Sequence, residues 1–141
     1  MKSCEDIKQV APQCMKRQEK CVDDDSRMYD DDKVHASSSY SLRTKDKIKR
    51  DIMTYGTVTA AFTVYEDFLT YKSGVYQHLS GGMEGGHAIK VIGWGLDEES
   101  GLDYWLCVNS WNNTWGDKGT FKIKMGECHI EDQMHAGLAA L

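Results

Sequence analysis

Two runs of β-branched and aromatic residues, separated by a short acidic loop, constrain the fold of this chain more than any other feature. The first run covers residues 85–95 and the second covers residues 104–111. The intervening residues are acidic and include a glycine, so the pattern predicts two antiparallel strands joined by a loop. If Gly95 faces Tyr104, antiparallel counting places His87 opposite roughly position 112, within about two residues of register error. The open end of this hairpin is therefore expected to bring distant residues together.

The open end of the hairpin is predicted to combine an imidazole, a carboxamide and an indole. Side chains alternate along a strand, so one face should carry Trp105, Cys107, Asn109 and Trp111, with His87 pointing to it. Asn109 can accept a hydrogen bond from one ring nitrogen of His87 without adding a negative charge, which leaves the other nitrogen to face a sulfur. A thiolate–imidazolium enzyme needs this arrangement. The alternative, for an isolated histidine, is a buried His beside a structural tryptophan.

The flanking sequence favours the catalytic interpretation. The motifs are Gly-Gly-His-Ala-Ile at residues 85–89, Asn-Ser-Trp-Asn-Asn-Thr-Trp-Gly at residues 109–116, and Gly-Thr-Phe at residues 119–121. They resemble the His and Asn motifs of papain-like cysteine proteases, and residues 65–78 resemble the cathepsin B branch in particular. The resemblance runs from about Pro12 to the C-terminus, and motifs of this length are specific.

The resemblance implies a role for each matched residue. It makes His87 the general base and acid, Asn109 its orienting partner and Trp111 the shield over their hydrogen bond. It places Gly85 and Gly86 on the substrate-binding rim, where a missing Cβ lets a peptide backbone approach closely.

The segment at residues 128–137 resembles the Cys-Gly-Ile-Glu segment of the family, with two departures. His129 replaces the family's Gly, which matters if the position requires a positive φ. Gln133 aligns with a position that holds a Glu at the base of the S2 pocket in cathepsin B, where it favours Arg. A neutral Gln cannot pair with an arginine charge, so we expect a shift toward apolar P2 side chains.

The nucleophile of the family has no counterpart in this sequence. It belongs to a Cys-Gly-Ser-Cys-Trp type segment that opens a long helix, preceded by an oxyanion-hole Gln, and neither occurs in the 141 residues. The resemblance implies the C-terminal half of a cysteine peptidase that forms a thioester acyl-enzyme, uses no cofactor and cleaves peptides or proteins. Alone, this half is expected to be inactive. Two alternatives stay open: a catalytically dead half-domain that binds peptides or proteases, and a processed chain disulfide-linked to the partner that carries the nucleophile.

The implied fold class is α+β, an antiparallel sheet or open barrel with one main helix, as in the right-hand domain of the papain-like fold. Residues 1–42 are expected to be an irregular remnant of the left-hand domain with the crossover, and residues 43–141 to form the β-rich domain. Ile48, Ile52 and Tyr55 make one apolar stripe of a helix over residues 44–55, with Thr44 as N-cap and Gly56 as its end. Alternation predicts further strands at residues 57–64 and 120–125.

The chain has five cysteines. Three fall within its first 21 residues, which suits a disulfide-stapled secreted or lysosomal region: Cys4, Cys14 and Cys21. In the cathepsin B branch similar cysteines bond to partners upstream, and a local bridge between Cys14 and Cys21 is the alternative. A zinc site made with His35 lacks the close cysteine pairs that such sites use, so no metal is expected. Cys107 and Cys128 are expected to be small buried side chains or free thiols.

Charge and hydropathy limit the partners. The net charge of -5 argues against nucleic acid or an anionic membrane as a partner, and no apolar run approaches a membrane span. The resemblance implies peptide or protein substrates, the missing N-terminal half and cystatin-like inhibitors as partners, in a lysosome or vacuole or outside the cell, although no signal peptide follows Met1.

Asn112-Asn113-Thr114 matches a glycosylation acceptor in a loop that borders the family's cleft, and its use stays open.

Overall fold

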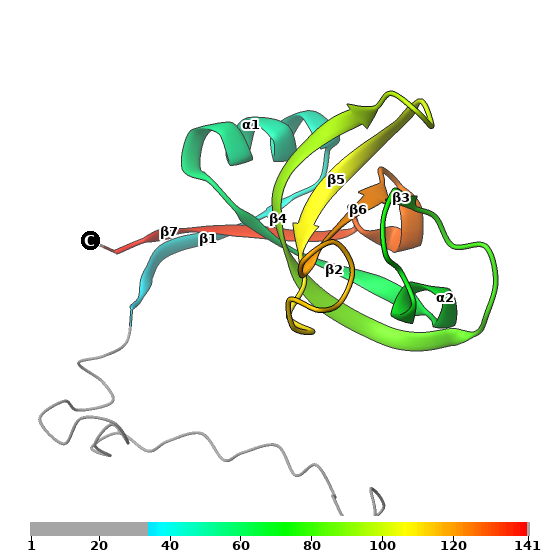
Figure 1. The fold of residues 1–141 in the computed structure, drawn as a ribbon. Coiled ribbons are helices and arrows are strands. Elements are labelled where there is room, and N and C mark those ends of the chain that lie inside the picture. The colour runs from blue at the N-terminus through cyan, green and yellow to red at the C-terminus, as the bar shows by residue number, and fades with distance from the viewer. Residues whose placement is uncertain (1–33, 141) are drawn as a thin grey trace, which may run out of the picture. The chain divides into compact units, whose positions relative to one another are not determined.

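One mixed sheet dominates the computed structural model, which describes residues 34–140 (Figure 1). The expectations for Cys4, Cys14 and Cys21, and for an irregular segment over residues 1–33, lie outside the described residues. The sheet has seven strands in the order β1-β7-β2-β4-β5-β6-β3. All neighbouring strands are antiparallel except β3 and β6, which are parallel. The α+β fold class is confirmed.

In chain order the elements are β1 (Ala36–Leu42), α1 (Lys45–Tyr55), β2 (Val58–Tyr65), α2 (Glu66–Leu69), β3 (Val75–Tyr76), β4 (Met83–Asp97), β5 (Leu102–Val108), β6 (Thr120–Lys124), the short 3-10 turn η2 (Glu127–His129) and β7 (Gln133–Ala139). Strands therefore form at or near each run in which apolar residues alternate. Neither helix of the described part is long and apolar enough to cross a membrane.

Helix α1 forms where its apolar spacing predicts it, but its buried face differs from the expected stripe. Thr44 caps the helix through its side chain, and Ile48 is fully buried. Tyr55, expected on the same stripe, is 63% exposed. Asp51 is buried instead, because its carboxylate accepts a hydrogen bond from the Tyr40 hydroxyl at 2.8 Å. The hydrogen bond from Tyr40 of β1 therefore helps to set which face of α1 is buried, and apolar periodicity alone did not predict that face.

The β-rich domain begins earlier than the expected boundary after residue 42. The segment assigned to the irregular crossover forms β1, which pairs with β7 from Ala36 opposite Ala139 to Leu42 opposite Met134. Only Leu42 of β1 is buried, so its sequence carries no alternating apolar signal. Backbone pairing with β7 makes this segment a strand, and the two strands run side by side away from the rest of the sheet (Figure 1).

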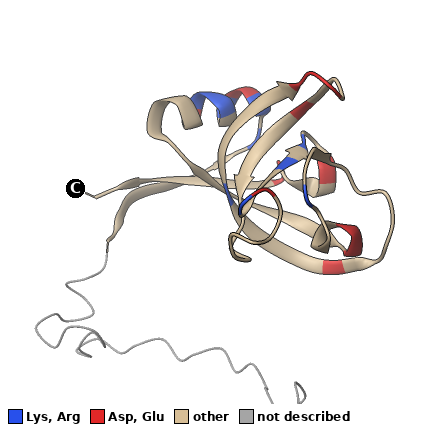
Figure 2. Ribbon diagram, in the orientation of Figure 1, with Lys and Arg blue, Asp and Glu red and all other residues tan. Residues whose placement is uncertain are grey.

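The core forms on one face of the central strands. Strand β2 buries alternate side chains as predicted, and the core also takes residues from α2, β5 and β6; its largest fully buried members from these elements include Phe68, Trp105, Cys107, Phe121 and Ile123. Apart from the buried Asp51, charged side chains in the described part lie outside it, with Lys and Arg on α1 and Asp and Glu at the tip of the β4–β5 hairpin (Figure 2). The other end of that hairpin, next to the aromatic core, holds the predicted site residues.

Candidate active site

A short hydrogen bond joins the two side chains that the sequence paired. His87 Nε2 lies 2.8 Å from Asn109 Oδ1. An amide oxygen can only accept a hydrogen bond, so Nε2 carries a proton and Nδ1 is left to bind or release the second one. The Ser110 backbone N–H donates to the same oxygen at 2.8 Å. Asn109 Nδ2 is buried and has no hydrogen-bond partner in the described part of the chain, so the amide is held through its oxygen.

The strand register explains how these residues meet. Gly95 pairs with Tyr104, the pairing from which the hairpin count started, and a bulge in β4 then shifts the register by one residue. Strand β5 ends at Val108, so Asn109 follows the strand, whereas the sequence predicted it within the strand. Past the bulge Val91 pairs with Cys107, so antiparallel counting places His87 opposite Trp111, within the expected register error, and the Asn109 side chain still reaches His87.

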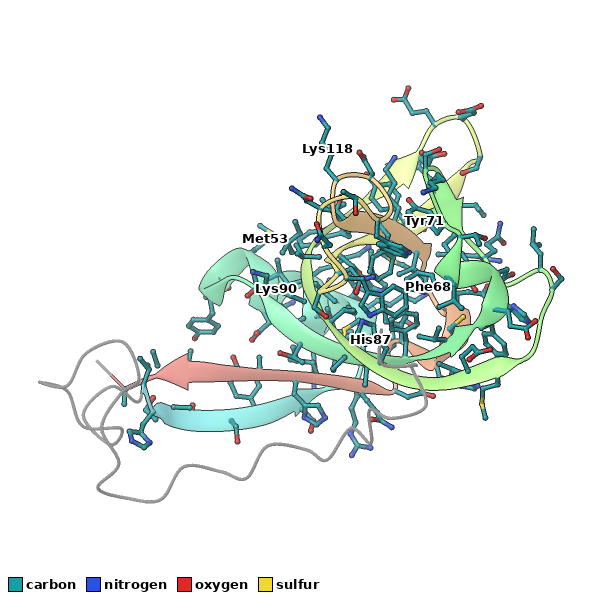
Figure 3. All side chains as sticks on the ribbon, turned by 60° about the horizontal axis from the view of Figure 1, so that its bottom comes forward. Met53, Phe68, Tyr71, His87, Lys90 and Lys118 are labelled. Carbon is teal, nitrogen blue, oxygen red and sulfur yellow. The ribbon has the colours of Figure 1, made fainter. Side chains whose placement is uncertain are left out.

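Aromatic side chains cover the hydrogen bond. The Trp111 indole stacks on the His87 imidazole, with ring centroids 4.8 Å apart and planes inclined by 28°. Trp111 also contacts Phe68 at 5.6 Å and Trp115 at 5.2 Å. Phe62 of β2 and the His87 imidazole form an edge-to-face pair, with ring centroids 6.1 Å apart and planes inclined by 64°. Figure 3 shows His87 at the edge of the side-chain cluster around Phe68. These contacts fix both rings and limit the access of water to the bond between them.

An open hollow of about 360 Å³ lies along β4 at Gly86, the residue before His87. Its lining comes from β2, β4 and the segment leading into β7: Ala61, Phe62, Thr63, Gly86, His129, Asp132 and Gln133. The hollow thus brings together Gly86 and Gln133, two of the residues predicted for substrate binding, while Gly85 lies outside its lining. A Cβ built on either glycine would meet no atom within 4 Å, so both face open space.

One wall of the hollow is a turn with an unusual backbone. Gly126, Cys128 and His129 have φ values of 89°, 51° and 62°. The position where His129 replaces the family's Gly therefore does adopt a positive φ, which favours glycine. Glu131 holds the turn, because its carboxylate accepts hydrogen bonds from Trp105 Nε1 at 2.9 Å and from the Gly126 N–H at 2.7 Å.

Three polar residues of the hollow were missed by the sequence analysis as site residues. His129 Nδ1 lies 3.2 Å from Asp132 Oδ2, and Thr63 adds a hydroxyl group. A signal for Thr63 was present, because the residues between the buried positions of β2 must point to the other face. Asp132 gave no such signal, since its position depends on the fold of the turn.

The cysteines of the described part lie in the core. Cys107 and Cys128 are both free and buried. Burial raises the pKa of the Cys107 thiol far above its ordinary value and that of the Cys128 thiol to about 12. Neither thiol is a nucleophile near neutral pH, as the sequence predicted. Within residues 34–140, no group of three or more His, Cys, Asp or Glu side chains could hold a metal ion.

Known proteins resemble this chain in sequence and fold. The family described as "Papain family cysteine protease" matches residues 3–138. A "Cathepsin B-like cysteine proteinase" of Schistosoma japonicum is 48% identical over 130 residues, covering 90% of this chain and 36% of that protein. "Cathepsin B-like cysteine proteinase 3" of Caenorhabditis elegans is 49% identical over 118 residues, covering 80% of this chain and 31% of that protein.

A relative of shorter length and a solved structure agree. "Cathepsin B-like cysteine proteinase 3" of Ostertagia ostertagi is 46% identical over 130 residues, covering 90% of this chain and 72% of that protein. The structure of "proCathepsin B S9 from Trypanosoma congolense" matches with a TM-score of 0.77 and 37% identity, covering 85% of this chain and 40% of that one. The chain thus spans 36% and 31% of the Schistosoma and Caenorhabditis proteins.

Proposed function

The chain belongs to the papain family of cysteine proteases, in its cathepsin B-like branch, and from this premise we propose that the complete protein hydrolyses peptide bonds with His87 as general base and acid. In this proposal Asn109 orients the imidazole and Trp111 shields their hydrogen bond. The nucleophile is a cysteine thiolate from an N-terminal half that lies outside these 141 residues. No cofactor takes part, because a thiolate, an imidazole and water supply every group that the reaction requires.

The proposed reaction has two halves. In the first, the cysteine sulfur attacks the peptide carbonyl carbon, and the imidazolium of His87 gives its Nδ1 proton to the leaving amine as the carbon–nitrogen bond breaks. In the second, neutral His87 takes a proton from water while the water oxygen attacks the thioester carbon. The carbon–sulfur bond then breaks, and the acid product leaves the regenerated thiolate. Nε2 keeps its proton throughout, because Asn109 Oδ1 accepts a hydrogen bond from the Nε2–H group.

One observation carries the proposal. His87 Nε2 is committed to Asn109 Oδ1 at 2.8 Å beneath the stacked Trp111 ring, and the described residues offer Nδ1 no competing partner. A neutral orienting group suits a site that must also hold a thiolate. A carboxylate in its place would add a second negative charge near the sulfur and disfavour the thiolate. A purely structural histidine would need neither a fixed tautomer nor an unoccupied second nitrogen.

The hollow at Gly86 supports a proposal on substrate preference. Gln133 carries no charge, and the only carboxylate in the lining, that of Asp132, lies 3.2 Å from His129. An arginine side chain therefore finds no unpaired carboxylate there, and we infer a preference for apolar P2 side chains. Gln133→Glu in the complete protein should raise cleavage of a P2-Arg substrate relative to a P2-Phe substrate about tenfold, the size of one charged hydrogen bond. A strong Arg preference before the substitution would refute the inference.

The experiment that tests the catalytic proposal is a comparison of variants in the complete protein, with its N-terminal half present. We expect His87→Ala to abolish peptide turnover and Asn109→Ala to leave partial activity, because the orienting group is less essential than the proton carrier. His135→Ala, a change at an exposed histidine on β7, is the matched control and should keep full activity. Equal loss in the first two variants would contradict the division of roles.

A thiol-directed protease probe separates the enzyme from its alternative. Labelling of the complete protein, lost in a variant of its nucleophile, supports catalysis. Peptide binding without labelling would instead identify a catalytically dead half-domain that acts as a binding module. Under the catalytic proposal, the further partners are cystatin-like inhibitors, and the compartment is a lysosome or vacuole or the outside of the cell.

A further inference from the structure

The chain contains one acceptor sequence for N-linked glycosylation. Its three asparagines are at positions 109, 112 and 113, and only Asn112 is followed at the second position by Ser or Thr, here Thr114. The residue between them is Asn113, not the proline that would block the motif. A glycan released from this chain would therefore map to Asn112 alone.

The structure turns the acceptor outward. Asn112, Asn113 and Thr114 are all exposed, while the tryptophans on either side, Trp111 and Trp115, have ring centroids 5.2 Å apart and both contact Phe68 of the core. Because Trp111 and Trp115 both pack against the core, the three residues between them project into solvent. We propose that Asn112 carries an N-linked oligosaccharide.

The side-chain amide of Asn112 is available for this bond. Its Oδ1 accepts a hydrogen bond from the Asn113 N–H at 2.6 Å, whereas the described residues offer its Nδ2 no hydrogen-bond partner. A φ of 80° at Asn112 suits asparagine, which tolerates the left-handed region. That conformation explains an asparagine at this position, but it gives no reason for Thr114, whose hydroxyl has no hydrogen-bond partner in residues 34–140. The acceptor sequence accounts for both.

The loop also leaves room for a bulky group. Its ends are closed by the hydrogen bond from the Asn109 N–H to the Gly119 carbonyl at 2.9 Å, and Figure 3 shows Lys118 of the same loop extending away from the molecule. None of the residues that line the hollow beside Gly86 comes from this loop. An oligosaccharide on Asn112 thus stands at the edge of the site, next to Trp111, without filling the hollow.

The modification is a group transfer to nitrogen. Asn112 Nδ2 forms a bond to the anomeric carbon of an oligosaccharide carried on a lipid pyrophosphate, and the bond between that carbon and the pyrophosphate oxygen breaks. The lipid pyrophosphate leaves, and the proton lost by the amide goes to solvent or base. The inference rests on the proposed secretory or lysosomal route, because the transferring enzyme acts in the secretory pathway.

The test is expression of the complete protein through the secretory pathway of a eukaryotic cell, followed by treatment with an amidase that removes N-glycans. The wild-type chain is expected to migrate faster after treatment, and peptide mass spectrometry should find aspartate at position 112. Thr114→Ala should abolish the aspartate at position 112 and the part of the mobility shift that this glycan contributes, whereas Thr114→Ser and Asn113→Gln keep the acceptor and should retain both. Because Thr114 is exposed, the Ala and Ser variants form a pair that changes the acceptor with little change to the fold.

The outcomes separate this inference from the proposed function. A secreted wild-type chain that shows neither the mobility shift nor the aspartate overturns the glycan, even if the protein reacts with the thiol-directed probe. Retention of the aspartate at position 112 in Thr114→Ala would also overturn it. A glycosylated protein that fails to react with the probe would support the glycan and contradict the catalytic proposal.

Discussion

The His87–Asn109 pair and the turn at residues 126–132 form neighbouring parts of one site, yet they are held in different ways. The pair is surrounded by aromatic rings that reach the core, with Trp111 stacked on His87 and Phe68 fully buried behind it. The turn walls the hollow with polar side chains and a backbone in which Cys128 and His129 have positive φ.

The difference concerns how precisely each part must be placed. In the proposed function His87 carries protons, which requires a narrow geometry, and close-packed rings restrict the movement of the side chains that they contact. A wall that selects side chains can vary in charge and shape while the chemistry stays the same. We therefore expect substitutions behind the pair to affect the whole domain, and substitutions in the turn to have smaller and more local effects.

Phe68→Ala tests the aromatic support of the His87–Asn109 pair and should have the largest effect on stability. Phe68 is 0% exposed and contacts Phe62, Trp111, Trp115 and other rings, so its truncation should lower the free energy of unfolding by about 3–5 kcal/mol. Urea unfolding followed by tryptophan fluorescence measures the loss. Leu69→Ala is the matched control, because Leu69, the neighbour of Phe68 in α2, is 46% exposed and should lose little. Equal losses in both variants would contradict the special role of the aromatic cluster.

Asp67 supports the same cluster through polar contacts and adds a pH dependence. Its carboxylate accepts hydrogen bonds from the Tyr76 hydroxyl at 2.6 Å and from the N–H groups of Leu79 and Ser80 at 2.8 Å and 3.1 Å. Burial alone would raise the pKa of this carboxyl, but the hydrogen bonds outweigh it and hold the pKa well below its ordinary value. The stabilisation is therefore complete above the unfolded pKa of about 4 and is lost as the pH falls toward the folded value.

Asp67→Ala is expected to lower the free energy of unfolding by about 1–3 kcal/mol at pH 7, because it leaves hydrogen-bond donors without their acceptor. The difference from the wild type should shrink as the pH falls below about 4. Urea titrations across a pH series measure it, with Asp103→Ala, at an exposed carboxylate of β5, as the control. A difference that stays constant down to strongly acidic pH would show that the carboxylate charge plays no part.

Glu131→Gln tests the support of the turn. The change removes the negative charge that binds Trp105 Nε1 and the Gly126 N–H, and a Gln oxygen can replace only part of it, so we expect a loss of about 1 kcal/mol. In the complete protein, the ratio of P2-Phe to P2-Arg cleavage should change while probe labelling of the nucleophile stays constant. Glu99→Gln, in the exposed hairpin loop, should change neither. A fall in labelling would mean that the two parts of the site are coupled.

His129→Gly has the smallest expected effect and the opposite sign. The φ of 62° at His129 costs a side-chain-bearing residue more than glycine, and after the entropy of the glycine chain is counted the gain should be about 0.5–1 kcal/mol. His135→Gly, in the extended strand β7, should instead lose a similar amount. Thermal unfolding of the two variants measures the contrast, and destabilisation by both would refute the assignment of backbone strain to the turn.

Sequence alone determined the parts of this protein that depend on local pattern. Local periods and turn residues predict the alternation in β2, the cap and apolar spacing of α1 and the antiparallel hairpin of β4 and β5. The same hairpin counting brought His87 and Asn109 together, because an antiparallel pair converts sequence distance into spatial distance. Alignment with the family added Gly86 and Gln133, which share one hollow.

Tertiary structure decided what those patterns leave open. Strand β1 has no apolar alternation and exists because β7 pairs with it, and Asp51 rather than Tyr55 is buried because Tyr40 donates to it. The polar wall of the hollow, with Asp132 next to His129, depends on a turn whose backbone is set by Glu131 and Trp105, residues 26 apart in sequence. These contacts join segments that are distant in sequence, and neither segment contains a pattern that indicates the other. They can therefore be identified only in the folded structure.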